Sequence, residues 1–427
     1  MDLLRLVTAG SVDDGKSTLI GRLLYDSKQV FEDTMASLER ASAAQGLDDV
    51  NLALLTDGLR AEREQGITID VAYRYFATPK RKFIIADSPG HVQYTRNMVT
   101  GASTAELALI LVDARKGVIE QTRRHTAITT LLGIQHLVVC INKMDLVDWS
   151  ESRYREIEAD YRAFAARLEV PTVTLVPMAA VSGDNIVDRS ANMPWYTGPA
   201  LLEFLEEVVV PDPARHADLR FPVQYVIRPQ SNEHHDYRGY AGTVAAGVVE
   251  VGGHVTVLPL GKSTRVVAID RFDQSLAAAE HGDAVTIRLE EDIDVSRGYM
   301  LVSEGPQAPT TSRFTADICW MSDTTVLRPG GQYWVKHTTR RVKCRVESLD
   351  SLLDVDTLER ISNPDGVALN DLARVTIKTL EPLFMDSYAI SRDTGSFILI
   401  DASTRKTVAA GMVRDVAPAE AVNDDSF

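Results

Sequence analysis

The residues with the clearest chemical meaning form one short segment near the start of the sequence. Residues 10–17 read Gly-Ser-Val-Asp-Asp-Gly-Lys-Ser, between an apolar run at 3–9 and a helix-prone stretch at 19–25. Glycines let backbone N–H groups turn toward a phosphate, and a following helix adds the positive end of its dipole. We expect Lys16 to reach the β- and γ-phosphates and the Ser17 hydroxyl to bind Mg²⁺. The segment predicts a nucleoside triphosphate site made of Gly10, Ser11, Val12, Asp13, Asp14, Gly15, Lys16, Ser17 and Thr18.

A second segment indicates which base is bound. Asn142, Lys143 and Asp145 close an apolar run at residues 136–142, which places them at the carboxyl end of a buried parallel strand, where doubly wound sheets bind ligands. Guanine presents two neighbouring donors that one carboxylate can accept, so Asp145 is the predicted guanine reader. We expect Asn142 to tie the loops together and the Lys143 stem to lie against the ring. The two segments together predict GTP.

A third segment, residues 87–91, follows the apolar run at 83–86 and is predicted to sense the γ-phosphate. Asp87 is expected to hold Mg²⁺ through water. The Gly90 N–H can approach the γ-phosphate because no side chain blocks it. His91 comes next and is expected to orient the attacking water. The alternative for His91 is a solvated loop histidine.

Thr68, in the segment Gln-Gly-Ile-Thr-Ile-Asp at residues 65–70, is the candidate for a nucleotide-dependent switch. Its hydroxyl would contact Mg²⁺ and the γ-phosphate only in the triphosphate state, so hydrolysis would free the segment. The alternative is an ordinary threonine in a β-prone stretch. The predicted catalytic set is therefore His91, Lys16, Thr68 and Gly90, and the predicted metal set is Ser17, Thr68 and Asp87.

Pattern changes along the chain predict three domains and a tail. Over residues 1–210, apolar strands alternate with helical stretches, which is typical of a doubly wound, mostly parallel α/β sheet. After a proline-containing linker, short strands predict one antiparallel β-barrel at 219–305 and a second at 310–416, and the acidic end, 417–427, is expected to be disordered. The predicted barrel strands are 223–227, 242–249, 254–258, 265–272 and 284–289, followed by a second set that includes 313–320, 332–337, 341–349, 373–380 and 407–413.

Length and composition limit the function classes. The chain has 427 residues and a net charge of −15, which argues against a general nucleic-acid-binding surface, although a local patch could still hold RNA. Its three cysteines form no Cys-x-x-Cys pair and are expected to be reduced packing residues. The sequence shows neither a signal peptide nor an apolar run of membrane-spanning length. We therefore expect a cytoplasmic protein without a nucleic-acid or membrane partner.

The four segments, in this order, resemble the translation-factor GTPases of the elongation factor Tu superfamily. Within it, residues 10–24, 57–70 and 97–106 resemble the GTPase (large) subunits of the bacterial two-subunit sulfate adenylyltransferases. This resemblance implies that GTP hydrolysis drives formation of adenosine 5′-phosphosulfate and diphosphate from ATP and sulfate by a separate catalytic small subunit. The alternative is a translation-factor GTPase that delivers aminoacyl-tRNA, because the shared GTP-binding motifs do not separate the two.

One loop departs from the family pattern. The last guanine-binding loop usually carries Ser-Ala-Leu, whereas Ala179, Ala180 and Val181 stand at these positions. The resemblance implies that Ala179 and Ala180 line the guanine site and that the Ala180 N–H meets the guanine O6, since a main-chain donor does not depend on its side chain. The sequence contains no second phosphate-binding loop after Ser17, so we expect no fused adenylylsulfate kinase.

Overall fold

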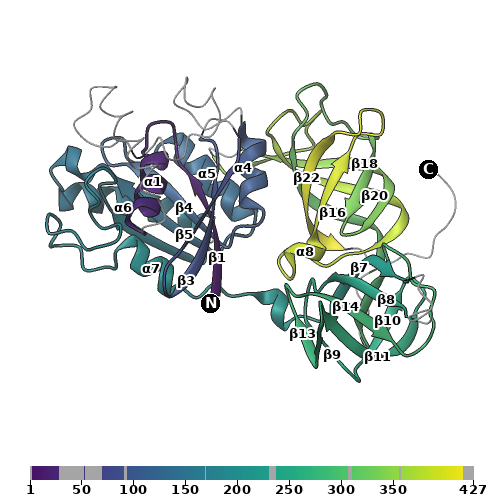
Figure 1. Cartoon of the computed structure of the whole chain (residues 1–427). Coiled ribbons are helices and arrows are strands. Elements are labelled where there is room, and N and C mark those ends of the chain that lie inside the picture. The colour runs from purple at the N-terminus through teal and green to yellow at the C-terminus, as the bar shows by residue number, and fades with distance from the viewer. Residues whose placement is uncertain are drawn as a thin grey trace. The chain divides into compact units, whose positions relative to one another are not determined.

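The computed structural model divides the chain into two compact units (Figure 1). Unit 1 contains residues 1–210 and 355–358, and unit 2 contains residues 211–354 and 359–427. The residues that the structure describes are 2–27, 52, 70–90, 94–168, 170–229, 237–305, 310–354 and 357–416. Thr68 and His91 lie outside the described residues, so their predicted roles are not addressed by the geometry below.

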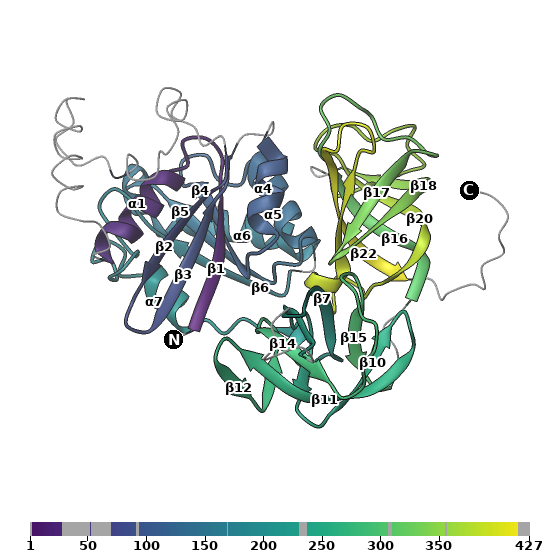
Figure 2. The same cartoon turned by 45° about the vertical axis from the view of Figure 1, so that its right-hand side comes forward.

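Unit 1 is built on a six-stranded sheet with the order β2-β3-β1-β4-β5-β6 (Figure 2). Its strands are β1 (Asp2–Ala9), β2 (Ala72–Ala77), β3 (Arg81–Asp87), β4 (Leu107–Asp113), β5 (His136–Asn142) and β6 (Thr172–Pro177). Neighbouring strands run parallel except for the edge strand β2, which is antiparallel to β3. All seven residues of β4 are buried, as expected for a strand covered on both faces. The predicted doubly wound, mostly parallel sheet is confirmed.

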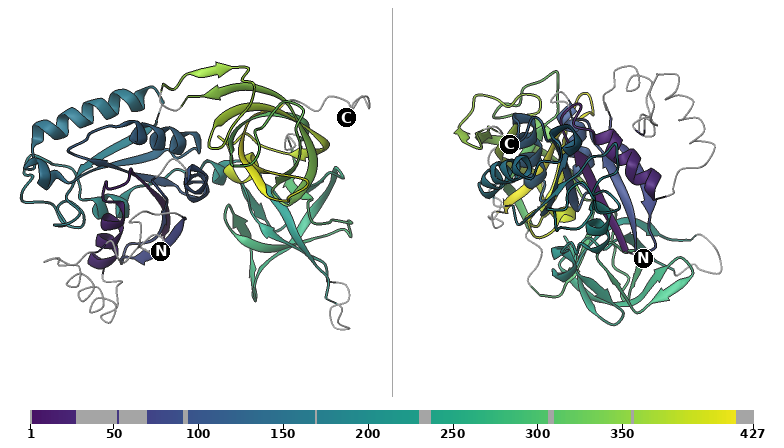
Figure 3. Two further views of the ribbon diagram at one scale, coloured as in Figure 1. Left: turned by 90° about the horizontal axis from the view of Figure 1, so that it is seen from above. Right: turned by 90° about the vertical axis from the view of Figure 1, so that its left-hand side faces the viewer.

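Helices cover both faces of this sheet (Figures 1 and 3). They are α1 (Lys16–Asp26), α4 (Thr95–Ala102), α5 (Glu120–Leu131), α6 (Glu151–Ala166), α7 (Leu201–Glu207) and the short 3₁₀ helix η3 (Met144–Val147). In α6, the Ser150 side chain caps the first turn by accepting from the Arg153 N–H, at 3.3 Å. Tyr154, Ile157 and Tyr161 recur at helical spacing and are buried, so this face packs on the sheet.

The first half of unit 2 is an antiparallel barrel. Its strands are β7 (Arg220–Ile227), β8 (Gly239–Thr243), β10 (His254–Leu258), β11 (Lys262–Arg271), β14 (Ala284–Leu289) and β15 (Met300–Ser303), with β12 (Gln274–Leu276), β9 (Val248–Glu250) and β13 (Ala278–Glu280) added outside the ring. The ring closes because β10 pairs with both β11 and β15. The predicted single strand at 242–249 is wrong: Gly247, with φ +72°, turns the chain between β8 and β9.

The second half of unit 2 is another closed antiparallel barrel, seen end-on in Figure 3. Its strands are β16 (Thr310–Trp320), β17 (Gln332–His337), β18 (Arg340–Leu353), β20 (Leu372–Phe384), β21 (Ser396–Ile400) and β22 (Thr407–Val416), with β19 (Arg360–Ser362) added to β18. Pairing of β17 with both β18 and β21 closes this ring. Two short helices, η4 (Pro213–His216) and α8 (Arg392–Gly395), complete the unit. The predicted succession of an α/β sheet and two barrels is confirmed.

Among the described residues, no helix has the length and apolar character needed to cross a membrane.

Candidate nucleotide-binding site

The loop between β1 and α1 has the backbone of a phosphate cradle. Its Ser11 N–H donates to Asp14 Oδ2 at 2.8 Å, and the Asp14 N–H donates to Ser11 O at 3.2 Å, which closes the loop on itself. Gly15 has φ +90°, and a Cβ there would lie 2.3 Å from Asn142 Nδ2, so only glycine fits. Helix α1 starts without a side-chain cap and without an acidic residue in its first turn. Its first N–H groups therefore suit an anion.

A buried ion pair stands at the end of the two strands that lead into the site. Lys16 Nζ, on α1, pairs with Asp87 Oδ1 at the end of β3. Thr8, the register partner of Asp87 on β1, donates its hydroxyl to the same oxygen at 3.3 Å. The two charged side chains are only 7% and 2% exposed. A buried ammonium group beside a buried carboxylate, with Ser17 as the next residue of the first turn of α1, fits a phosphate accompanied by Mg²⁺.

The loop after β3 packs directly against the phosphate-binding loop. Ser88 Oγ donates to Thr8 O at 2.5 Å, which fixes the start of this loop. A Cβ on Gly90 would lie 2.1 Å from Gly10 O, a distance that no side chain can occupy. Only glycine allows this approach, so the segment expected to sense the γ-phosphate lies against the phosphate-binding loop.

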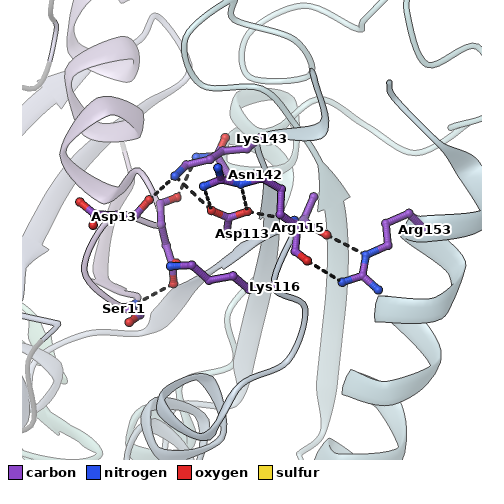
Figure 4. Close-up of polar contacts among 10 residues, drawn as sticks. Ser11, Asp13, Asp113, Arg115, Lys116, Asn142, Lys143 and Arg153 are labelled. Carbon is purple, nitrogen blue, oxygen red and sulfur yellow. Dashed lines mark hydrogen bonds and ion pairs between the residues drawn. The ribbon is translucent and has the colours of Figure 1, made fainter. Parts of the chain in front are cut away.

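Asn142, at the end of β5, links two other loops of the site (Figure 4). Its Nδ2 donates to Asp14 O at 2.8 Å. Its Oδ1 accepts from the Ala180 N–H at 2.9 Å, in the loop after β6. This N–H is the donor expected to meet guanine O6, so a bound guanine would share or replace the bond to Asn142. Ala179 and Ala180 are both buried.

Lys143 is held in place by a buried carboxylate that sequence reasoning missed. Its Nζ lies 3.1 Å from Asp113 Oδ2 and also donates to Asp13 O (Figure 4). Asp113 accepts from the Arg115 Nε at 3.0 Å and from the Arg115 Nη2 at 2.7 Å. Burial by itself would raise the pKa of Asp113, but the hydrogen bonds from Arg115 and Lys143 outweigh it and hold the pKa well below its usual range. The Lys143 stem is therefore fixed across the loops.

Asp113 carries a signal that could have identified it. It ends β4 just as Asp87 ends β3 and Asn142 ends β5, at the same edge of a parallel sheet. The rule that ligands bind at the carboxyl ends of parallel strands, applied to β4 as it was to β3 and β5, would have placed Asp113 in the site.

The remaining loops are anchored to α1 and to the turn after β4. Arg22 Nε, on α1, donates to Ala180 O at 3.2 Å, and its Nη2 donates to Val181 O.

Burial raises the pKa of Asp14 to about 6. Asp14 Oδ1 has no hydrogen-bond partner in the described part of the chain but lies 3.6 Å from Lys116 Nζ, which offsets its charge beside the cradle. Asp145 is half-buried in the first turn of η3.

The fold and this cradle define a P-loop GTP-binding protein. The model of the elongation factor Tu GTP binding domain matches residues 1–211, and that of the GTP-eEF1A C-terminal domain-like family matches residues 313–414. The chain belongs to the family of sulfate adenylyltransferase subunit 1, which confirms the resemblance identified in the sequence.

Three relatives illustrate this membership. The bifunctional enzyme CysN/CysC of Mycobacterium tuberculosis is 58% identical over 97% of this chain and 68% of that protein. Sulfate adenylyltransferase subunit 1 of Bacteroides fragilis is 52% identical over 97% of this chain and 86% of that protein. The Colwellia psychrerythraea subunit 1 is 49% identical over 100% and 91%. A solved structure of sup35 complexed with GDP is 28% identical, covers 97% of this chain and 94% of that chain, and has a TM-score of 0.45.

Proposed function

We propose that this chain binds Mg²⁺·GTP and hydrolyses it to drive sulfate activation by a separate small subunit. The catalytic small subunit would join ATP and sulfate into adenosine 5′-phosphosulfate and diphosphate. The observation that carries this proposal is a phosphate cradle and guanine loop in a chain that matches subunit 1 proteins over nearly its full length. The proposed domains are residues 1–210 for GTP binding, 219–305 and 310–416 for the two barrels, and 417–427 for a tail.

Nucleotide binding is assigned to three groups of residues. Residues 10–18 and the uncapped start of α1 would hold the phosphates, with Lys16 exchanging its Asp87 partner for phosphate oxygens. Asn142, Lys143 and Asp145 would hold guanine, with Ala179 and Ala180 on its other side. Ser17, Thr68 and Asp87 would hold Mg²⁺, which neutralises charge on the phosphate oxygens.

Hydrolysis is assigned to the segment after β3. The Gly90 N–H would contact the γ-phosphate, and His91 would orient the attacking water while Lys16 neutralises the charge that develops on the transferred group. The close packing of Gly90 on Gly10 O supports the role of Gly90, because it brings the Gly90 backbone against the phosphate-binding loop. Thr68 and Gly90 would couple the presence of the γ-phosphate to the state of the partner. This coupling requires that the two states of the partner differ in affinity for the nucleotide-bound subunit.

The proposed partner is the small subunit, and neither a nucleic acid nor a membrane is proposed as a partner. We place the two subunits in the cytoplasm. Cys140, Cys319 and Cys344 support a reducing compartment, because all three are buried and free.

The deciding experiment is GTP turnover by the purified chain, alone and with a co-expressed small subunit, with ATP and sulfate added separately and together. Strong stimulation of GTP turnover is expected only when partner, ATP and sulfate are all present, and adenosine 5′-phosphosulfate should then be formed.

The His91→Ala variant should turn over GTP at least about 100-fold more slowly, as for other lost general catalysts, with nearly unchanged GDP affinity. Turnover that ignores all three additions, together with GTP-dependent retention of aminoacyl-tRNA, would contradict the proposal and favour the carrier alternative.

A further inference from the structure

Gln121, on α5, contacts the segment that follows β3, and His125 on the same helix contacts Gln121. Gln121 Nε2 donates to the Gly90 carbonyl oxygen at 2.9 Å. The same nitrogen lies 2.9 Å from His125 Nε2, one helical turn along. The His125 side chain is buried. Neither residue belongs to the phosphate-binding loop, the guanine loop or the predicted metal set.

The chemistry of these contacts fixes the protonation of His125. A carbonyl oxygen only accepts, so the NH₂ end of the Gln121 amide must face Gly90. Its second hydrogen then points to His125 Nε2, which must offer a lone pair, and the ring proton sits on Nδ1. Burial, followed by the charges of Lys16 and Arg124, lowers the pKa of His125 to about 3, in agreement with a neutral ring. Nδ1 has no hydrogen-bond partner among the residues described, so within this part of the chain it is Gln121 that selects the tautomer.

The bond to the Gly90 carbonyl restrains the peptide group to which this carbonyl belongs. This carbonyl belongs to the peptide that joins Gly90 to His91, and a peptide group is planar. Holding its oxygen therefore limits how the Gly90 backbone can turn against the phosphate-binding loop. Gly90 has no Cβ to restrict its own backbone, so an external hydrogen bond is the means of limiting its orientation.

We infer that Gln121 and His125 are positioning residues for GTP hydrolysis: His125 orients the Gln121 amide, which holds the Gly90 carbonyl and so the backbone of the segment predicted to sense the γ-phosphate. The inference rests on the proposed function, in which His91 orients the attacking water. Both residues act through the Gly90 carbonyl, so they should affect the rate of the chemical step and leave nucleotide binding nearly unchanged.

The test compares kcat, KM for GTP and GDP affinity among variants of the full chain. Gln121→Met keeps the side-chain length but removes the donors. It should lower kcat roughly 10- to 100-fold, the cost of a misplaced catalytic group, with KM and GDP affinity within about twofold of wild type. Gln224→Met is the matched control, because Gln224 lies on β7 and donates only to Thr243 Oγ1 among the contacts described.

Two changes at His125 make the test specific. His125→Leu removes the acceptor and should lower kcat in the same way, whereas His125→Gln offers an amide oxygen near the position of Nε2 and should restore most of it. The double variant Gln121→Met/His125→Leu should be no slower than Gln121→Met, because both residues act on one chain of hydrogen bonds.

The outcomes separate this inference from the proposed function. If His91→Ala is slow while Gln121→Met turns over normally, the positioning role is overturned and the proposed function stands. If Gln121→Met weakens GDP binding and thermal stability in parallel with kcat, or if His125→Gln fails to exceed His125→Leu, the two residues are structural and the inference is overturned. If His91→Ala turns over GTP at the normal rate, the catalytic assignment fails and the inference fails with it.

Discussion

At the scale of single residues, the site depends on close approaches that most side chains would prevent. A Cβ at Gly15 would meet Asn142 Nδ2, and one at Gly90 would meet Gly10 O. Because the loops lie this close together, the single side-chain amide of Asn142 can bond both to Asp14 O and to the Ala180 N–H. Asp145, the proposed guanine reader, lies on the loop that Asn142 begins, so base choice can be tested by one isosteric change.

The Asp145→Asn variant should lose guanine preference. An amide places a donor where guanine also donates, whereas xanthine offers a carbonyl oxygen at that position. GTP affinity should fall roughly 30-fold or more, since charge-assisted hydrogen bonds contribute about 1.5–3 kcal/mol, and xanthosine triphosphate should bind better than GTP. Competition binding with labelled GDP measures both affinities.

Asp148→Asn is the matched control for this change. Asp148 is exposed, follows η3 and has φ +52°, a backbone conformation that asparagine also tolerates. Its GTP affinity should stay at the wild-type level. Retained guanine preference in Asp145→Asn would remove Asp145 from the base-binding role.

At the scale of elements, one buried carboxylate joins four strands of the second barrel. Asp317, on β16, accepts from Arg374 of β20 at 3.0 Å and from Arg414 of β22 at 2.7 Å, and Arg360 of β19 approaches to 3.5 Å. Burial by itself would raise the pKa of Asp317, but the hydrogen bond from Arg374 and the charges of Arg414 and Arg360 outweigh it and lower the pKa. The carboxylate thus offsets repulsion among three guanidinium groups.

Replacing Asp317 by asparagine should destabilise this barrel by about 2 kcal/mol, because three partly exposed guanidinium groups lose the buried carboxylate that offsets their charges. The folded pKa lies below the unfolded one, so the Asp317 contribution is present above about pH 4 and is lost as the pH falls further. The difference in urea unfolding between wild type and Asp317→Asn should therefore shrink at acid pH. Asp323→Asn, at an exposed position, is the control. A pH-independent difference would contradict this account.

At the scale of the molecule, polar and apolar contacts hold the two barrels of unit 2 together. Arg220, on β7, donates to both carboxylate oxygens of Asp386 at 3.0 and 3.1 Å, and both side chains are buried. His281, after β13, contacts Asp212 before η4 at 2.6 Å and Asp393 in α8 at 3.4 Å. The apolar residues of this junction are Leu258, Met300, Val302 and Phe384. The junction therefore combines the buried Arg220–Asp386 ion pair with the contacts of His281, whose charge depends on pH.

The His281 contacts should make the junction pH-dependent. Hydrogen bonds to Asp393 and Asp212 raise the pKa of His281 to about 9. A raised folded pKa means that the stabilisation is complete below the unfolded value of about 6.5 and is lost as the pH rises through about 9. Since Asp393 is largely exposed, we expect a loss of about 1–2 kcal/mol. Urea unfolding of wild type and His281→Gln at pH 6 and pH 10 measures it.

At pH 6, His281→Gln should be less stable than wild type, and at pH 10 the two should agree. His254→Gln is the control, because His254 is an exposed residue of β10. Equal differences at the two pH values would show that the imidazolium charge does not stabilise the junction.

The fold was predictable where neighbours in sequence define an element. The strands β10, β14 and β17 match their predicted bounds, because apolar alternation and flanking turns mark them locally. The ring-closing strands β15 and β21 were not among the strands named from the sequence. Both are short, and what makes them strands is pairing with segments distant along the chain. The merged prediction at 242–249 failed for a related reason, since the turn at Gly247 packs on Ala217 O.

By itself, the sequence determined the chemistry that adjacent residues supply: the phosphate-binding loop, the guanine loop, and the order of sheet and barrels. These depend on local backbone freedom, side-chain type and apolar period. Only the tertiary structure decided which distant residues meet. Asn142 reaches Asp14 across 128 positions and Gln121 reaches Gly90 across 31, because parallel strands end at one edge of the sheet. Spacing along the chain carries no record of such contacts, since strand order and helix packing create them.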